Sequence, residues 1–92
     1  MNLTTPIEET VLESLGAMRP GTRGRIAHFD PVSDGHGHDL ADRLREIGFA
    51  ENLEVEVLHQ SPFGRDPIAV RVGKMTVALR RREANIVKVH VA

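Results

Sequence analysis

The sequence predicts a mainly β domain, a small barrel of five short strands with one short α-helix inserted between the first and second strands. Three observations predict this fold class. Apolar residues recur at every second position in residues 68–72 and again in residues 75–79, which is the pattern of strands with one buried face. Only Gly73 and Lys74 separate these runs, and a two-residue loop with glycine first suits a type II′ hairpin turn. The length of 92 residues allows one domain with a small core.

The remaining strands are predicted from shorter patterns. Residues 24–29 contain the first strand, in which Ile26 faces inward. Residues 53–57 alternate apolar residues with glutamates, as in a strand with one solvated face, and residues 87–91 place three valines on one face of a closing strand. Residues 81–85 are too few for a full α-helix, so a single 3₁₀ turn is expected before the last strand. Because free strand edges are a liability that small all-β domains remove by curling closed, we expect a five-stranded SH3-like barrel.

The inserted helix is predicted over residues 39–47. Leu40, Leu44 and Ile47 fall at i, i+4 and i+7, which makes one apolar stripe. Gly48 then ends the helix as a left-handed cap. Such a stripe most often docks its helix on the core, so we expect this helix to cover part of the barrel.

An N-terminal extension is expected to precede the barrel. Residues 5–8 have the composition of a helix start, because threonine can cap, proline suits the first helical position and glutamate completes a capping box. We therefore expect residues 1–13 to form an extension with a short helix, and residues 14–92 to form the barrel domain.

Composition and charge exclude several classes of protein. The chain has no cysteine, which excludes disulfides, thiolate metal sites and cysteine nucleophiles. The formal net charge of −1 argues against sequence-independent nucleic-acid binding, in which phosphate neutralisation supplies most of the affinity. No apolar run reaches the roughly 18–20 residues of a membrane span, and the acidic N-terminus lacks the apolar core of a secretory signal. We therefore expect a cytoplasmic protein with no direct membrane insertion.

Enzyme motifs are missing from the sequence. Serine, histidine and aspartate occur, but none of them stands in a nucleophile elbow, a phosphate-binding loop or an HExxH motif. The chain also has no tyrosine or tryptophan, so the aromatic groove with which many SH3 domains bind proline-rich ligands is not expected. We expect a protein that is not an enzyme and requires no cofactor.

Several short motifs follow one another in a fixed order and spacing. They are Leu15 with Pro20-Gly21, Gly24-Arg25-Ile26, Leu40 with Arg43-Leu44, Ile47-Gly48-Phe49, Val55 with Val57, residues 62–64 with residues 66–68, residues 78–81, and Glu83-Ala84 before Ile86. Together they resemble the FeoA family, ferrous iron transport protein A. Arg65, which stands as an extra residue between two of these pieces, and the long histidine-rich loop of residues 30–38 depart from the family pattern.

The resemblance implies a function. FeoA proteins are small cytosolic SH3-like domains associated with FeoB, the bacterial membrane transporter of ferrous iron, which has a cytosolic GTPase domain. The same fold forms the C-terminal domain of iron-dependent repressors. We therefore expect an accessory protein of ferrous iron uptake that acts by protein–protein interaction with FeoB.

Candidate partner-binding residues are Leu58, Phe63, Arg80, Arg81 and Arg82. Leu58 falls on the face opposite the inward valines of its strand and Phe63 lies in a loop, so both are candidates for exposed apolar surface. Three consecutive arginines can grip an anionic surface, although such a cluster is more often a solvated polar face with packed side-chain stems. Alternate residues of a strand point oppositely, so we expect Arg81 to project away from its two neighbours. Where the cluster has a function, we expect it to contact an acidic partner surface.

Candidate metal ligands are His36, His38 and Asp39. Imidazole nitrogens suit both Zn²⁺ and Fe²⁺, and these three residues fall within four positions. A flexible His-x-His pair binds transition metals weakly, so adventitious or intermolecular bridging by Zn²⁺ or Fe²⁺ is favoured over a complete site within one chain. The competing interpretation is a solvated loop in which Asp39 begins the helix.

Three alternative functions stay open. A regulatory fragment like the repressor's C-terminal domain would act on an attached DNA-binding module, although the chain begins at Met1 and contains no helix-turn-helix motif. A small barrel that binds nucleic acid would use Arg80 to Arg82, although the chain has few aromatic residues for base stacking. A metal-bridged oligomer, such as a homodimer, or a metal-responsive binding module would use His36 and His38.

Overall fold

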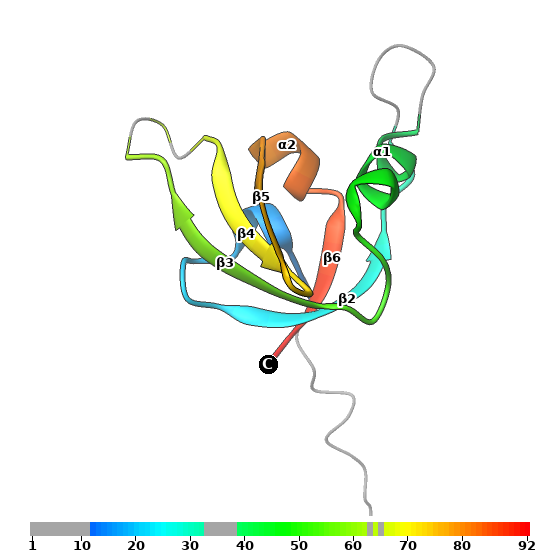
Figure 1. The fold of residues 1–92 in the computed structure, drawn as a ribbon, viewed down its shortest axis with the longest axis horizontal. Coiled ribbons are helices and arrows are strands. Elements are labelled where there is room, and N and C mark those ends of the chain that lie inside the picture. The colour runs from blue at the N-terminus through cyan, green and yellow to red at the C-terminus, as the bar shows by residue number, and fades with distance from the viewer. Residues whose placement is uncertain (1–11, 33–38, 63, 65) are drawn as a thin grey trace, which may run out of the picture.

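Six antiparallel strands make up the sheet in the part of the chain that the structure describes (Figure 1). The computed structural model describes residues 12–32, 39–62, 64 and 66–92. The strands are β1 (Leu12–Ser14), β2 (Arg23–Phe29), β3 (Glu54–Gln60), β4 (Ile68–Val72), β5 (Met75–Leu79) and β6 (Val87–Val91). They are hydrogen-bonded in the order β1-β6-β2-β3-β4-β5, so the last strand in sequence lies between the first two. The mainly β class is confirmed. The sheet curls, but no pairing of described residues joins β5 to β1 and closes it.

The predicted strand boundaries are largely confirmed, and the predicted strand number is corrected from five to six. The additional strand, β1, begins at Leu12 and pairs with β6. A 3₁₀ helix, η2 (Leu15–Ala17), follows it directly. The helix start predicted at residues 5–8 lies outside the described residues.

The hairpin between β4 and β5 has the predicted turn. Val72 and Met75 are directly paired across Gly73 and Lys74. Gly73 has φ = +59°, whereas Lys74 is not among the described residues with positive φ. A positive φ at the first central position alone is the type II′ arrangement.

The segment after β5 differs from the prediction. Residues 81–85 were expected to form a 3₁₀ turn, but α2 (Arg81–Ala84) is one turn of α-helix. The amide N–H groups of Ala84 and Asn85 donate to the carbonyls of Arg80 and Arg81, at 3.0 and 2.9 Å, which is the i→i−4 pattern. The Glu83 carboxylate also accepts the Arg80 amide at 2.9 Å and so stabilises the start of the helix.

The core lies inside the curl of the sheet. It consists mainly of β-branched residues from the inward faces of the strands, which explains how a domain this small packs without tryptophan or tyrosine. The buried apolar residues are Leu15, Met18, Ile26, Leu40, Ala41, Leu44, Phe49, Val55, Val57, Ile68, Val70, Val72, Leu79, Ala84, Ile86, Val87 and Val89.

Helix α1 (Leu40–Ile47) lies between β2 and β3 in the chain, as predicted. The Asp39 side chain accepts the Ala41 amide at 3.0 Å and caps the N-terminus. At the other end Gly48 adopts φ = +127°, and the Phe49 amide donates to the Leu44 carbonyl at 3.0 Å. This Schellman-type ending turns the chain back and buries Phe49. The inclusion of Ile47 in the buried stripe was wrong: Ile47 is 45% exposed, because Phe49 fills the core at this end of the helix.

An ion pair fixes the end of α1 to the turn that follows it. Arg45 Nη1 and Nη2 donate to the two carboxylate oxygens of Glu51, each at 2.7 Å. The same guanidinium lies 4.6 Å from the centre of the Phe29 ring, a cation–π contact. The hydrogen bond from Arg45 lowers the pKa of Glu51 to about 2.

Candidate functional site

The three arginines of the predicted partner surface do not lie together. Arg80 precedes α2, and Arg81 and Arg82 begin it. Arg80 and Arg82 are exposed, whereas Arg81 is half-buried and faces the body of the protein. Arg81 therefore does point away from its neighbours, although helix geometry rather than strand alternation is the reason.

Arg81 connects three segments that are far apart in the sequence. Its Nη1 donates to the carbonyl of Gly16 in η2, and its Nη2 donates to Gln60 Oε1 at the end of β3, at 2.9 Å. Its backbone amide donates to Asp66 Oδ1 at 2.9 Å, in the loop before β4. These contacts indicate that Arg81 stabilises the fold at this corner rather than presenting its charge to a partner.

Gly16 lets η2 and α2 approach each other closely. A Cβ atom at this position would lie 2.0 Å from Asn85 Oδ1 and 3.0 Å from the Arg81 carbonyl oxygen. A side chain here would force the Asn85 side chain to move and would press tightly against the Arg81 carbonyl oxygen. The glycine therefore permits the hydrogen bond between the Gly16 carbonyl and Arg81.

An open hollow of about 710 Å³ lies beside this corner. Arg19 is exposed and has no carboxylate partner among the described residues. The described lining has no acidic residue, and its exposed positive charge is that of Arg19, since the Arg81 guanidinium is bonded to Gly16 and Gln60; an anionic segment would suit it. The described lining residues are Ala17, Met18, Arg19, Pro20, Gln60 and Arg81.

The two apolar residues predicted to be exposed, Leu58 and Phe63, are not shown as an exposed surface by the described residues. Leu58 is half-buried, next to a bulge in the pairing of β3 with β4 between Val57 and His59. Phe63 lies outside the described residues. Among the described residues the exposed large apolar side chains are Leu12 (47%), Val32 (43%) and Ile47 (45%), none of which the sequence analysis singled out as exposed.

Of the three predicted metal ligands, the structure describes only Asp39. His36 and His38 lie outside the described residues, and Asp39 uses one carboxylate oxygen to cap α1. No group of three or more His, Asp or Glu side chains that could hold a metal ion occurs among the described residues. The described part of the chain thus does not by itself fit a resident metal.

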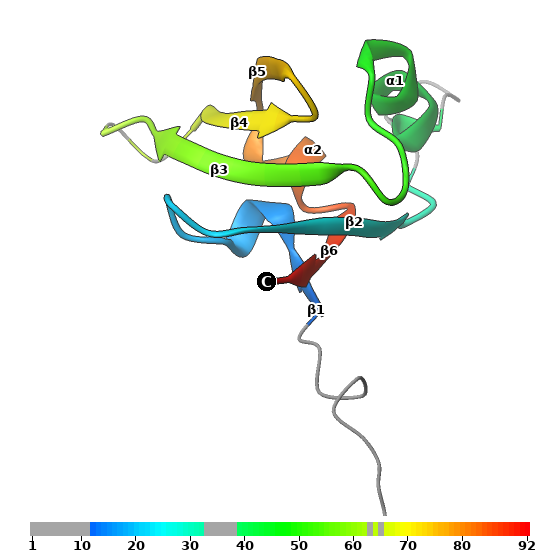
Figure 2. The same ribbon diagram turned by 60° about the horizontal axis from the view of Figure 1, so that its bottom comes forward.

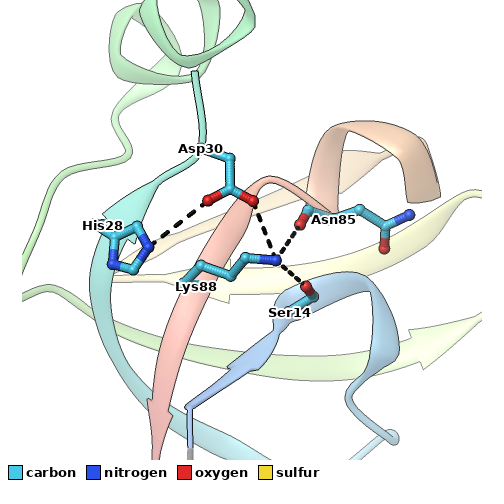
Figure 3. Close-up of polar contacts among 5 residues, drawn as sticks. All are labelled: Ser14, His28, Asp30, Asn85 and Lys88. Carbon is cyan, nitrogen blue, oxygen red and sulfur yellow. Dashed lines mark hydrogen bonds and ion pairs between the residues drawn. The ribbon is translucent and has the colours of Figure 1, made fainter. Parts of the chain in front are cut away.

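A cluster of polar side chains connects β1, near the start of the described chain, with β6 near its end (Figure 3). Lys88 Nζ, on β6, lies 3.2 Å from Asp30 Oδ2 and donates to Ser14 Oγ and to the Asn85 carbonyl. His28 Nε2 lies 3.7 Å from Asp30 Oδ1, too long for a hydrogen bond but suited to an ion pair when the ring is protonated. The amino group of Lys88 offers no ligand atom to a cation while charged, so the cluster fits a structural role that fastens β1 to β6 and α2.

None of the helices in the described part of the chain is both long and apolar enough to cross a membrane.

Comparison with known proteins identifies relatives of the whole barrel. The family model of the FeoA domain matches residues 13–91. No match was found among curated proteins. The crystal structure of FeoA from Stenotrophomonas maltophilia complexed with zinc is 30% identical, covers 85% of this chain and 93% of its own, and superposes with a TM-score of 0.69. That protein is described as a prokaryotic SH3 domain protein and proposed as a ferrous iron transport activating factor.

Two further structures have the same fold. Iron(II) transport protein A from Clostridium thermocellum is 32% identical with a TM-score of 0.72, over 86% of this chain and 45% of that one. A manganese-dependent transcriptional repressor is 22% identical with a TM-score of 0.74, over 88% of this chain and 42% of that one, and this likeness concerns the fold alone. The predicted SH3-like fold is confirmed by the likeness to the Stenotrophomonas maltophilia protein, which is described as an SH3 domain protein.

Proposed function

Because this chain belongs to the FeoA family, which is linked to ferrous iron transport, we propose that it is a non-enzymatic accessory protein of bacterial ferrous iron uptake. It acts in the cytoplasm by binding a cytosolic part of the FeoB transporter. The single observation that carries this proposal is the family match over residues 13–91, which covers nearly the whole barrel.

The binding surface is proposed to be the corner around η2 and α2. Arg19, Arg80 and Arg82 are exposed there, and none of them has a described carboxylate partner. Half-buried Leu58 adds apolar area on neighbouring β3. Exposed arginines without an intramolecular ion pair can pair with an acidic surface without first breaking such a pair, and they accelerate encounter with it. Arg81 contributes indirectly by holding the corner in shape.

Regulation of the transporter requires a conformational preference. A bound accessory domain can shift an equilibrium only by the difference between its affinities for the two states. We therefore expect the affinity for the GTPase domain to differ between its nucleotide-free and nucleotide-bound forms.

A two-dimensional amide NMR titration with the FeoB GTPase domain, with and without nucleotide, tests this proposal. Shifts that include η2, α2 and the end of β3 and that exclude α1 are the expected result. The double variant Arg80→Glu/Arg82→Glu should weaken binding at least tenfold, by analogy with charge reversal at other interfaces. The matched control is Arg43→Glu on α1, which should leave binding unchanged. An unchanged spectrum at near-physiological salt, with either nucleotide state, would remove the main support for the proposal.

A metal-bridged oligomer is the second candidate, and the zinc complex of the Stenotrophomonas relative favours it. His36 and His38 would supply ligands from each copy. Sedimentation velocity with and without Zn²⁺ or Fe²⁺ tests this, with His36→Ala/His38→Ala as the variant and His59→Ala as the single-histidine control. A mass that does not change with metal ends this candidate.

A further inference from the structure

The outer edge of β5 is not covered by another strand in the part of the chain that the structure describes. This strand ends the sheet, and among the described residues it pairs only with β4 (Figure 2). Its sequence, Met-Thr-Val-Ala-Leu, contains no charge and no proline, and its pairing with β4 runs without a bulge. Natural proteins normally protect a free strand edge with a charged residue, a proline or a β-bulge. The opposite edge strand, β1, is shorter and carries Glu13.

The hydrogen-bonding groups that face outward can be assigned from the register. Val72 and Met75 close a two-residue hairpin and therefore form a hydrogen-bonded pair. Pairs alternate along an antiparallel ladder, so Val77 and Leu79 also direct their amide and carbonyl groups toward β4. The amide and carbonyl groups of Thr76 and Ala78 consequently point away from β4. No other described backbone group bonds them, so they can pair with an added strand.

The side chains beside this edge suit an alternating segment. Thr76 and Ala78 are exposed, whereas Met75 and Val77 pack against the core but remain only half-buried. An added strand would place every second side chain on the core side, next to Met75 and Val77. Apolar residues at those positions would complete the burial of both.

The charges that flank β5 distinguish two possible binding partners of this edge, a second copy of the chain and a segment of another protein. Lys74 precedes the strand and Arg80 follows it. Two copies pairing antiparallel about Val77 would place Lys74 opposite Arg80 at both ends, a repulsive arrangement. A segment with an acidic residue at each end would instead meet both cations. A hollow of about 360 Å³ lined by Asp66, Pro67, Ala78, Arg80 and Glu83 leaves space at the Arg80 end.

Two carboxylates also line this hollow and keep their negative charge, so attraction of an acidic residue at this end depends on direct pairing with the Arg80 guanidinium. Asp66 and Glu83 each accept a backbone amide of α2, from Arg81 and Arg80 respectively. The Arg80 guanidinium has no carboxylate partner among the described residues.

We propose that the outer edge of β5 is a docking site for an extended segment of a partner protein, with alternating apolar residues between acidic ends. The segment adds a seventh strand by main-chain hydrogen bonds to Thr76 and Ala78. The inference rests on the proposed function in that the partner is a protein, and it names the recognition mode and the chemistry of the partner segment.

A peptide titration tests the proposal without the transporter. The probe is Glu-Val-Thr-Val-Thr-Val-Glu, and the control peptide carries lysine at both ends. The acidic peptide should shift the amide resonances of Thr76, Ala78 and Lys74 and leave those of α1 unchanged. Ala78→Pro should weaken binding roughly five- to tenfold, since it removes one outward donor and leaves the β4 pairing intact. Ala78→Val, which keeps the amide, is its matched control.

A charge swap gives a second, independent readout. Lys74→Glu/Arg80→Glu should reverse the preference, so that the lysine-ended peptide binds more tightly than the acidic one. Shifts that avoid β5, equal binding by Ala78→Pro and wild type, or no binding at millimolar peptide would each overturn the proposal. Concentration-dependent dimerisation through β5 would overturn it in favour of a second copy.

The outcomes for the two proposals are distinguishable. If the peptide binds β5 but the GTPase domain does not bind at all, the edge site stands and the transporter proposal fails. If the GTPase domain binds wild type and Ala78→Pro equally, the transporter proposal stands and the edge site is not the surface used.

Discussion

Replacing Arg81 with alanine tests whether this side chain holds the fold together. The substitution removes the guanidinium that donates to the Gly16 carbonyl and to Gln60 Oε1, while the backbone amide can still donate to Asp66. Three segments that are distant in the sequence would then lose their common anchor.

The expected loss follows from these contacts. A hydrogen bond to a charged group contributes roughly 1.5–3 kcal/mol; two such bonds at the lower end give about 3 kcal/mol, and the half-buried setting of Arg81 reduces the expected loss to about 2–3 kcal/mol. A domain of this length has a free energy of unfolding of roughly 5–14 kcal/mol. The melting temperature should therefore fall by roughly 10–20 °C.

Thermal unfolding followed by circular dichroism measures this loss, and urea unfolding gives the free energy. Arg82→Ala is the matched control, because Arg82 is exposed and has no described ion-pair partner. Its stability should stay within roughly 0.5 kcal/mol of wild type. Arg81→Lys should recover less than half of the loss, since a single ammonium cannot reproduce the fork of a guanidinium.

The refuting result is specific. If Arg81→Ala is as stable as Arg82→Ala, and both weaken binding to the GTPase domain, then Arg81 is a contact residue and the structural role assigned to it is wrong.

Three further substitutions probe the fold. Leu44→Ala should lower the free energy of unfolding by about 2–5 kcal/mol, as measured by urea unfolding, because Leu44 is fully buried where α1 meets the core. Gly16→Ala should cost about 1–3 kcal/mol because its Cβ meets Asn85 Oδ1, and adding Asn85→Ala should recover part of that loss in the same assay. Hydrogen bonding from Arg45 lowers the pKa of Glu51 from 4.5 to about 2. The contribution of this ion pair to stability should thus be complete above pH 4.5 and be lost as the pH falls to 2, and a melting-temperature profile of Glu51→Gln should lack that step.

The sequence predicted the strands that carry their own periodicity. The predicted ranges for β4 and β5 match the structure because a half-buried strand records its inward face in every second residue. β1 could not be predicted in this way. It has three residues, Leu12 and Glu13 are both exposed, and its only reason to be extended is pairing with β6 near the other end of the chain.

The contacts of the candidate site were harder to predict from the sequence than the fold was. A run of three arginines does not show that Arg81 bonds to Gly16, 65 positions away. The α-helical form of α2 is set by the i→i−4 bonds of the Ala84 and Asn85 amides, which a five-residue stretch of sequence did not indicate. Ile47 has the right spacing for the core, but the cap at Gly48 delivers Phe49 there instead. In each case a specific hydrogen bond or packing contact that the spacing of residues does not reveal decided the outcome.

The position of β6 constrains how the protein is made. β6 lies between β1 and β2, yet it emerges from the ribosome after every other described element. Until then, β1 has no described strand to pair with, and β2 presents an open edge beside β3. Until β6 emerges, the nascent chain stays in a partly assembled, association-prone state, and the pairing of β6 with β1 and β2 completes the sheet.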